Sequence, residues 1–279
     1  MKQAVASFVL LVGLAACAGP GGMSPSGGLM YQVPAAADVV YLTGDTSSID
    51  IDAGDMGSFR VRATSQATVG VSFSQAAGGV QVTATYQELL ARVSQPMGGD
   101  QSVTEEDIDG DIVFTMDGQG RSTVVSLPGL TEEAESMAEP HAFVYEFFPR
   151  LPGGSVGPGD SWTDTISYDA ALSSGDMSSN SVITSTLQGD TVVGGMTLLR
   201  VTFQGQADVY GSAVQEGMEM AQTAAGDLEG MYLWDPARSV LVFKETTVNL
   251  RGTMEVIGAG IPAMPLRVSG TSTVRLQGG

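Results

Sequence analysis

Residues 59–73, FRVRATSQATVGVSF, alternate between small or apolar side chains and polar ones. A period of two is typical of a β-strand with one buried and one solvated face. The side chains that would share the buried face are Phe59, Val61, Ala63, Ser65, Ala67, Val69, Val71 and Phe73. At ~3.3 Å per residue the run approaches about 50 Å, which is too long for an ordinary flat strand. We therefore predict a strand that is curved, or broken by a bulge near Gly70.

The same alternation recurs along most of the chain, between short turn sequences. The predicted hairpin turns are residues 77–79 (AGG), 117–120 (DGQG) and 235–238 (DPAR). Further alternating runs cover residues 199–209 and 266–276. One-faced strands joined by tight turns favour an antiparallel sheet over a parallel α/β fold. The predicted fold class is mainly β, with long curved antiparallel strands forming a half-barrel or sandwich and a few short helices.

Helix signals are confined to residues 131–148. Thr131 precedes Glu132-Glu133, which provides a cap and an acidic first turn, and Pro140 divides the segment into two short helical pieces. The Pro/Gly-rich residues 149–162 predict a linker between an N-terminal β half, 31–150, and a C-terminal β half, 151–279. Two more segments are predicted as a small polar loop, 173–180, and a mobile flap, 215–230.

The chain is strongly acidic. It has 31 Asp and Glu against 12 Lys and Arg, with a net charge of −19 at pH 7. Such a surface repels nucleic acid and anionic lipid head groups, so no nucleic-acid partner is expected. No glycine-rich phosphate loop opens a helix, and no cofactor is expected. After Lys2, the only lysine is Lys244.

The single cysteine, Cys17, ends a short apolar run. Lys2 supplies a positive start, residues 4–13 (AVASFVLLVG) an apolar stretch, and Leu14-Ala15-Ala16-Cys17 a small-residue cleavage site. This quartet resembles the lipobox of bacterial lipoproteins. The resemblance implies cleavage between Ala16 and Cys17, acylation of Cys17, and membrane attachment through the acyl chains. Residues 1–16 are then a signal peptide and residues 17–30 a flexible Gly/Pro/Ser-rich tether. Ala18, by the family's usual sorting rule, implies the outer membrane, with the body in the periplasm.

Catalytic motifs give little support for an enzyme. Residues 153–157 (GGSVG) fit the G-x-S-x-G string of serine hydrolases, but Pro152 before it and Gly157-Pro158-Gly159 at its end prevent the required strand–turn–helix. The only histidine, His141, lies upstream, whereas that fold supplies its histidine last. We interpret His141 as a structural residue and predict a protein that is not an enzyme.

Three aspartates form a weak calcium candidate. Asp107, Asp109 and Asp111 occupy alternate positions, like the first carboxylates of an EF-hand loop. Ile112 stands where that loop needs glycine, and Gly118 where it needs glutamate. A solvated acidic loop is the other interpretation, and no metal site is predicted.

Two non-catalytic functions remain open. The first is a carrier or binder of an apolar ligand or lipid, because Ala63, Ala67, Gly205, Ala207 and Gly270 leave room on the inner face of a curved sheet. In outline this is similar to the LolA/LppX group of carriers, which pair a bent sheet with a helical plug, and residues 131–148 would form the lid. The second is a structural envelope protein that binds a partner, such as a basic protein, through its strand edges and acidic surface. Residues 148–152 (FPRLP) and 156–162 (VGPGDSW) also resemble a junction in uncharacterised bacterial lipoproteins, which implies no activity.

Overall fold

The structure is a computed structural model that describes residues 29–54, 57–95, 99–135, 137–173, 175–215, 218–258 and 260–278. The strands are β1 (Asp38–Asp52), β2 (Ser58–Ala76), β3 (Gly79–Gln95), β4 (Gly99–Thr104), β5 (Ile108–Asp109), β6 (Ile112–Met116), β7 (Ser122–Ser126), β8 (Gly129–Leu130), β9 (Ser161–Leu172), β10 (Gly175–Val193), β11 (Met196–Gln215), β12 (Met218–Asp235), β13 (Val240–Ile257) and β14 (Met264–Leu276). The helical elements are η2 (Glu105–Asp107), α1 (Glu132–Glu135) and α2 (Pro140–Glu146). Within these residues, no helix has the length and apolar character needed to cross a membrane.

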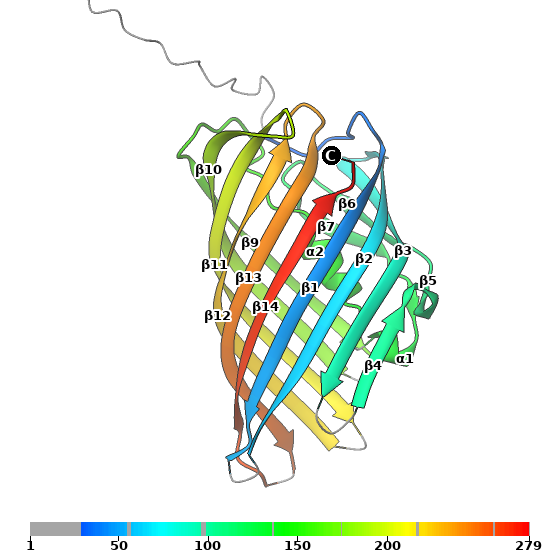
Figure 1. Ribbon diagram of the computed structural model, residues 1–279, viewed down its shortest axis with the longest axis vertical. Coiled ribbons are helices and arrows are strands. Elements are labelled where there is room, and N and C mark those ends of the chain that lie inside the picture. Colours follow the sequence, from blue (N-terminus) through cyan, green and yellow to red (C-terminus); the bar gives the residue numbers. More distant parts are fainter. Residues whose placement is uncertain are drawn as a thin grey trace, which may run out of the picture.

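One antiparallel sheet of 12 strands curls around the short helix α2 to form a half-barrel (Figure 1). The order of its strands is β7-β6-β3-β2-β1-β14-β13-β12-β11-β10-β9, and β4 pairs with β3 outside this order. The long strand β3 therefore carries β6 on residues 80–84 and β4 on residues 90–95. β1 pairs with β14, which joins the two parts of the chain into one continuous sheet. Of the two predicted arrangements, half-barrel and sandwich, the structure has the half-barrel.

The alternating stretch 59–73 lies within β2, as predicted. A register shift between Thr68 and Val69 marks a bulge, because Gln87 of β3 has no partner on β2. Gly70 belongs to this bulge, since a Cβ on it would lie 2.6 Å from Nε2 of Gln87. An extra residue in one strand bends it and increases the local twist. The bulge predicted near Gly70 is confirmed.

Two predicted hairpin turns are each closed by an aspartate. The Oδ1 atom of Asp117 accepts hydrogen bonds from the backbone N–H of Gln119 (2.8 Å) and Arg121 (2.9 Å). Oδ1 of Asp235 likewise accepts from the N–H of Ala237 (2.9 Å) and Arg238 (3.0 Å). The aspartate side chains accept hydrogen bonds from backbone N–H groups that have no backbone partner in the turn, which explains why each turn begins with aspartate. The turns between β6 and β7 and between β12 and β13 are confirmed.

The core lies between the inner face of the sheet and a plug formed by α2 and residues 147–151. Phe147, Phe148 and Leu151 are buried there, together with Pro149 and Arg150. The ring of Phe148 meets Tyr31, Tyr41, Phe73, Phe114 and Phe147 at centroid distances of 4.8–6.3 Å. Aromatic pairs at such distances add to the stability that burial provides. The prediction of a linker is therefore wrong for residues 149–151, because the curled sheet needs their side chains to fill its interior.

Two segments expected to be irregular are strands. Residues 175–180 of the predicted loop belong to β10 and pair with β9, while residues 218–230 of the predicted flap belong to β12 and pair with both β11 and β13. Polar side chains in these two segments suit the outer face of a tightly curled sheet, and small side chains suit its crowded inner face. Backbone pairing with long neighbours thus determines their structure despite weak local alternation.

Candidate functional site

A hollow of about 990 Å³ opens beside α2, at the end of the β9–β10 hairpin. Its polar lining includes Glu135, His141, Ser173 and Asp176, and its apolar lining consists of Leu127, Pro128, Leu130, Pro140, Ala171, Leu172 and Val214. Oε1 of Glu135 accepts a hydrogen bond of 2.9 Å from the N–H of Ser173, which ties α1 to the turn between β9 and β10. The volume is at the upper end of the range for small-molecule sites, and polar and apolar groups contribute about equally to the lining of this open hollow.

The inner face of the sheet is not buried along its full length. Beside the plug, Val69, Val201 and Tyr232 are buried, but further along the strands Val61, Val209 and Val248 are only half-buried. Figure 1 shows that the strands extend well beyond α2 toward the β1–β2 and β13–β14 hairpins. Of the small residues expected on the inner face, Ala67 and Ala207 are buried and Ala63, Gly205 and Gly270 half-buried. The curl thus offers a partly accessible wall of small and apolar side chains.

Ionisable groups gather where the plug meets the sheet. Nζ of Lys244, on β13, donates to the backbone oxygen of Glu146 at the end of α2. The carboxylate of Glu146 accepts a hydrogen bond of 3.0 Å from the hydroxyl of Tyr168 on β9. Tyr168 also stacks on Tyr145 of α2, with ring centroids 5.0 Å apart. These contacts attach α2 to β13 and to the edge strand β9.

The surroundings shift the pKa values of this cluster. Burial lowers the pKa of Lys244 to about 8, against the opposing attraction of Glu146, and the charge of Arg150 lowers it further. Burial raises the pKa of Glu146, although Lys244, Tyr168 and Arg150 favour its charged form. Burial and the negative charges of Glu146 and Asp45 raise the pKa of Glu139. Loss of hydration disfavours each charged form, as expected for groups on the inner side of a curled sheet.

The lowered pKa of Lys244 makes stability depend on alkaline pH. Between pH about 8 and its ordinary pKa of 10.5, the unfolded chain holds a proton that the folded chain has lost. The free energy of unfolding contributed by Lys244 therefore rises with pH across this window. We expect Lys244→Met to flatten that rise, measured by urea denaturation from pH 8 to pH 10. Arg200→Met, at an exposed position of β11, is the control. An unchanged slope in Lys244→Met would contradict the assignment.

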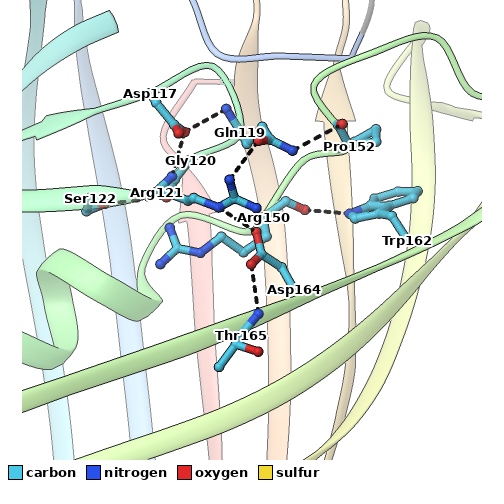
Figure 2. A network of polar contacts seen from close by, with 10 residues as sticks. All are labelled: Asp117, Gln119, Gly120, Arg121, Ser122, Arg150, Pro152, Trp162, Asp164 and Thr165. Carbon is cyan, nitrogen blue, oxygen red and sulfur yellow. Dashed lines mark hydrogen bonds and ion pairs between the residues drawn. The ribbon is translucent and has the colours of Figure 1, made fainter. Parts of the chain in front are cut away.

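A second polar network joins the two edges of the half-barrel (Figure 2). Nε of Arg121, just before β7, lies 3.1 Å from Oδ2 of Asp164 on β9, and its Nη1 donates to the side-chain oxygen of Gln119 (2.9 Å). The side-chain amide of Gln119 donates to the carbonyl of Pro152 (3.3 Å), while Nε1 of Trp162 donates to the carbonyl of Arg150 (3.0 Å). The turn before β7, the plug and β9 are thus held together at this end.

The residues predicted from the sequence fall outside these clusters, except His141. His141 lies on α2, half-buried, lines the 990 Å³ hollow, and burial lowers its pKa. Cys17 and Ala16 lie outside the described residues. Asp107 accepts from the N–H of Thr104 (2.9 Å) and Asp111 from Thr85, while Asp109 lies on β5. No group of three or more His, Cys, Asp or Glu among the described residues could hold a metal ion.

Sequence reasoning missed Glu146, Tyr168 and Arg150 as neighbours of Lys244. One signal was available for Lys244, which is the only lysine after Lys2 and lies in a strongly apolar strand. Its contact with Glu146 spans 98 residues, so no local pattern could reveal the partner.

Comparison with known proteins leaves the family open. No family model and no curated protein matches the chain. The beta domain of the Bordetella autotransporter BrkA aligns over 85% of this chain and 98% of its own, with 10% identity and a TM-score of 0.22. A putative outer membrane lipoprotein-sorting protein domain from Vibrio parahaemolyticus aligns over 85% of this chain and 86% of its own, with 10% identity and a TM-score of 0.14. At such scores, neither likeness defines a family or a function.

Proposed function

We propose that this protein is a non-catalytic, lipid-anchored protein of the bacterial envelope that binds an apolar ligand or lipid. The observation that carries the binding function is the 990 Å³ hollow beside α2, with its seven apolar lining residues. Removing apolar ligand surface from water contributes about 25 cal/mol per Å², which is the main source of affinity in such a site. The hollow is open to solvent, so a ligand can reach it.

The proposed anchor rests on the lipobox-like residues 14–17. Each acyl methylene that enters the bilayer contributes about 0.8 kcal/mol, so two or three chains hold a protein firmly. The acidic surface, with a net charge of −19, gives the body no attraction to anionic lipid head groups. We place the anchor in the outer membrane and the body in the periplasm, where the hollow can meet a lipid or another apolar compound.

Uptake of a neutral apolar fluorophore tests the binding function. We expect the chain from Ala18 onward, which carries no acyl anchor, to enhance and blue-shift the emission of N-phenyl-1-naphthylamine. Val214 lines the hollow and is 58% exposed, so Val214→Glu should weaken uptake several-fold with little effect on folding. Val192, 69% exposed near the β10–β11 turn and outside the lining, gives the matched control Val192→Glu. No uptake by the unaltered protein would overturn ligand binding and favour a partner-binding protein.

A further inference from the structure

The guanidinium of Arg150 is buried in the plug, and two of its three nitrogens have no hydrogen-bond partner among the described residues. The residue is 7% exposed, and neither Nε nor Nη1 has a partner among the described residues. Figure 2 shows its side chain extending away from Trp162 and Asp164, with no dashed line reaching the guanidinium. Only the backbone oxygen of Arg150 is bonded there, to Trp162. An unpaired buried charge is among the most costly arrangements in a protein interior.

The two aspartates whose charges act on Arg150 are already engaged elsewhere. The charges of Asp164 and Asp117 act on Arg150 and oppose the lowering of its pKa by burial. Yet Oδ2 of Asp164 pairs with Arg121, its Oδ1 accepts from the N–H of Thr165 (2.7 Å), and Asp117 closes the β6–β7 turn. Although the chain has 31 acidic residues, Nε and Nη1 of Arg150 have no hydrogen-bonded carboxylate among the described residues.

Two further donors lie on the inner face of the neighbouring strands. The hydroxyl of Tyr232, which is 0% exposed, also has no partner among the described residues. Tyr232 on β12 is paired in register with Lys244 on β13, so both side chains point to the same side of the sheet. The charge of Arg150 acts on both Lys244 and Glu146, which places the guanidinium within electrostatic reach of this cluster.

The buried atoms that lack a partner, Nε and Nη1 of Arg150 and the hydroxyl of Tyr232, can all donate hydrogen bonds. A guanidinium and an ammonium can only donate, and a tyrosine hydroxyl can also donate. The complementary ligand is rich in acceptors and negatively charged, because such hydrogen bonds are about twice as strong as neutral ones. We propose that Arg150, Tyr232 and Lys244 bind an oxyanion, either a carboxylate or a phosphate group. The group belongs either to a free anion or to the head of an amphiphile.

This site lies inside the fold and does not depend on the proposed hollow. Because Nε and Nη1 of Arg150 are covered, the anion enters only when residues 147–151 open locally, and association should be slow. The same covering removes water from the guanidinium, which strengthens the bond to an anion once it has entered.

The test uses the full chain in a neutral detergent, with ¹⁵N-labelled lysine. Only Lys2 and Lys244 can give signals, and Lys244→Met assigns them. We expect either sodium phosphate or dodecyl phosphate to shift the Nζ signal of Lys244 and to raise Tm, while sodium chloride at equal ionic strength and dodecanol do neither. A response to sodium phosphate identifies a free anion, and a response to dodecyl phosphate alone identifies a head group.

Variants separate the anion site from general effects. Arg150→Gln should weaken the response at least tenfold while its ligand-free Tm stays equal or rises, because an unpaired buried charge is removed. Tyr232→Phe, which keeps the ring, should weaken the response several-fold even if Arg150→Gln fails to fold, and Arg200→Gln should change nothing. Uptake of N-phenyl-1-naphthylamine should be unaltered in Arg150→Gln, which distinguishes this site from the hollow. No response of the unaltered chain to either phosphate, or an equal response of Arg150→Gln, would overturn the proposal.

Discussion

Phe148→Ala should lower the free energy of unfolding by about 3–5 kcal/mol. The side chain of Phe148 is 2% exposed and lies at the centre of the plug. Its ring touches two aromatic residues of the sheet strands β1 and β2, Tyr41 and Phe73, at centroid distances of 6.2 and 5.9 Å. Removing the ring costs its transfer free energy and leaves a cavity that the surrounding rings can fill only partly.

Urea denaturation, followed by tryptophan fluorescence, measures this loss. The matched control is Phe243→Ala, because Phe243 is half-buried in β13 and faces Arg275 at 5.8 Å in a cation–π contact. That contact contributes about 0.5–1 kcal/mol, so the control should lose far less stability than Phe148→Ala. Similar losses in the two variants would show that the plug does not stabilise the half-barrel.

Several of the long strands were predictable because they obey a local rule. In β2, alternation of period two over residues 59–73 is decided by the residues themselves, and Asp117 and Asp235 mark turns through their own side-chain hydrogen bonds. The composition of β12 is less informative. Residues 218–230 are small, polar or acidic, and only pairing with β11 and β13 along their whole length makes them a strand.

The part of the plug after residue 148 was not predictable from local pattern. Residues 149–154, PRLPGG, have the composition of a linker, yet Pro149, Arg150 and Leu151 are buried. What determines their position is a set of long-range contacts, including the hydroxyl of Tyr31, which donates to the carbonyl of Pro149 (2.7 Å) across 118 residues. A curled sheet encloses an interior that another segment of the chain must fill. Residues 147–151 fill it because burying the aromatic rings of Phe147 and Phe148 there lowers the free energy of the folded state.

The candidate sites were hidden for the same reason. Lys244 is conspicuous in the sequence, but Glu146, Tyr168 and Arg150 become its neighbours only after α2 enters the half-barrel. His141, in contrast, was singled out as the only histidine, and its structural interpretation stays a prediction although it lines the hollow.

Cys17→Ser should abolish acylation of the protein altogether. Cys17 is the only cysteine, so no other thiol can form the thioether that lipoprotein maturation requires. Growth with a radiolabelled fatty acid should label the unaltered protein and leave Cys17→Ser unlabelled. Incorporation into Cys17→Ser would contradict the proposed anchor.

Membrane fractionation tests the consequence of that anchor. With two or three acyl chains the protein should sediment with the membranes, since each buried methylene contributes about 0.8 kcal/mol. A variant in which the lipobox residues Leu14–Cys17 are replaced by an ordinary cleavage site should instead be released as a soluble protein. Ala18→Asp should keep the acyl chains but change the sorting, moving the protein from the outer to the inner membrane fraction. The described residues begin at Leu29, so these changes should leave the thermal unfolding of the half-barrel unaltered. A loss of folding in all of these variants would show that residues before Leu29 contribute more than an anchor.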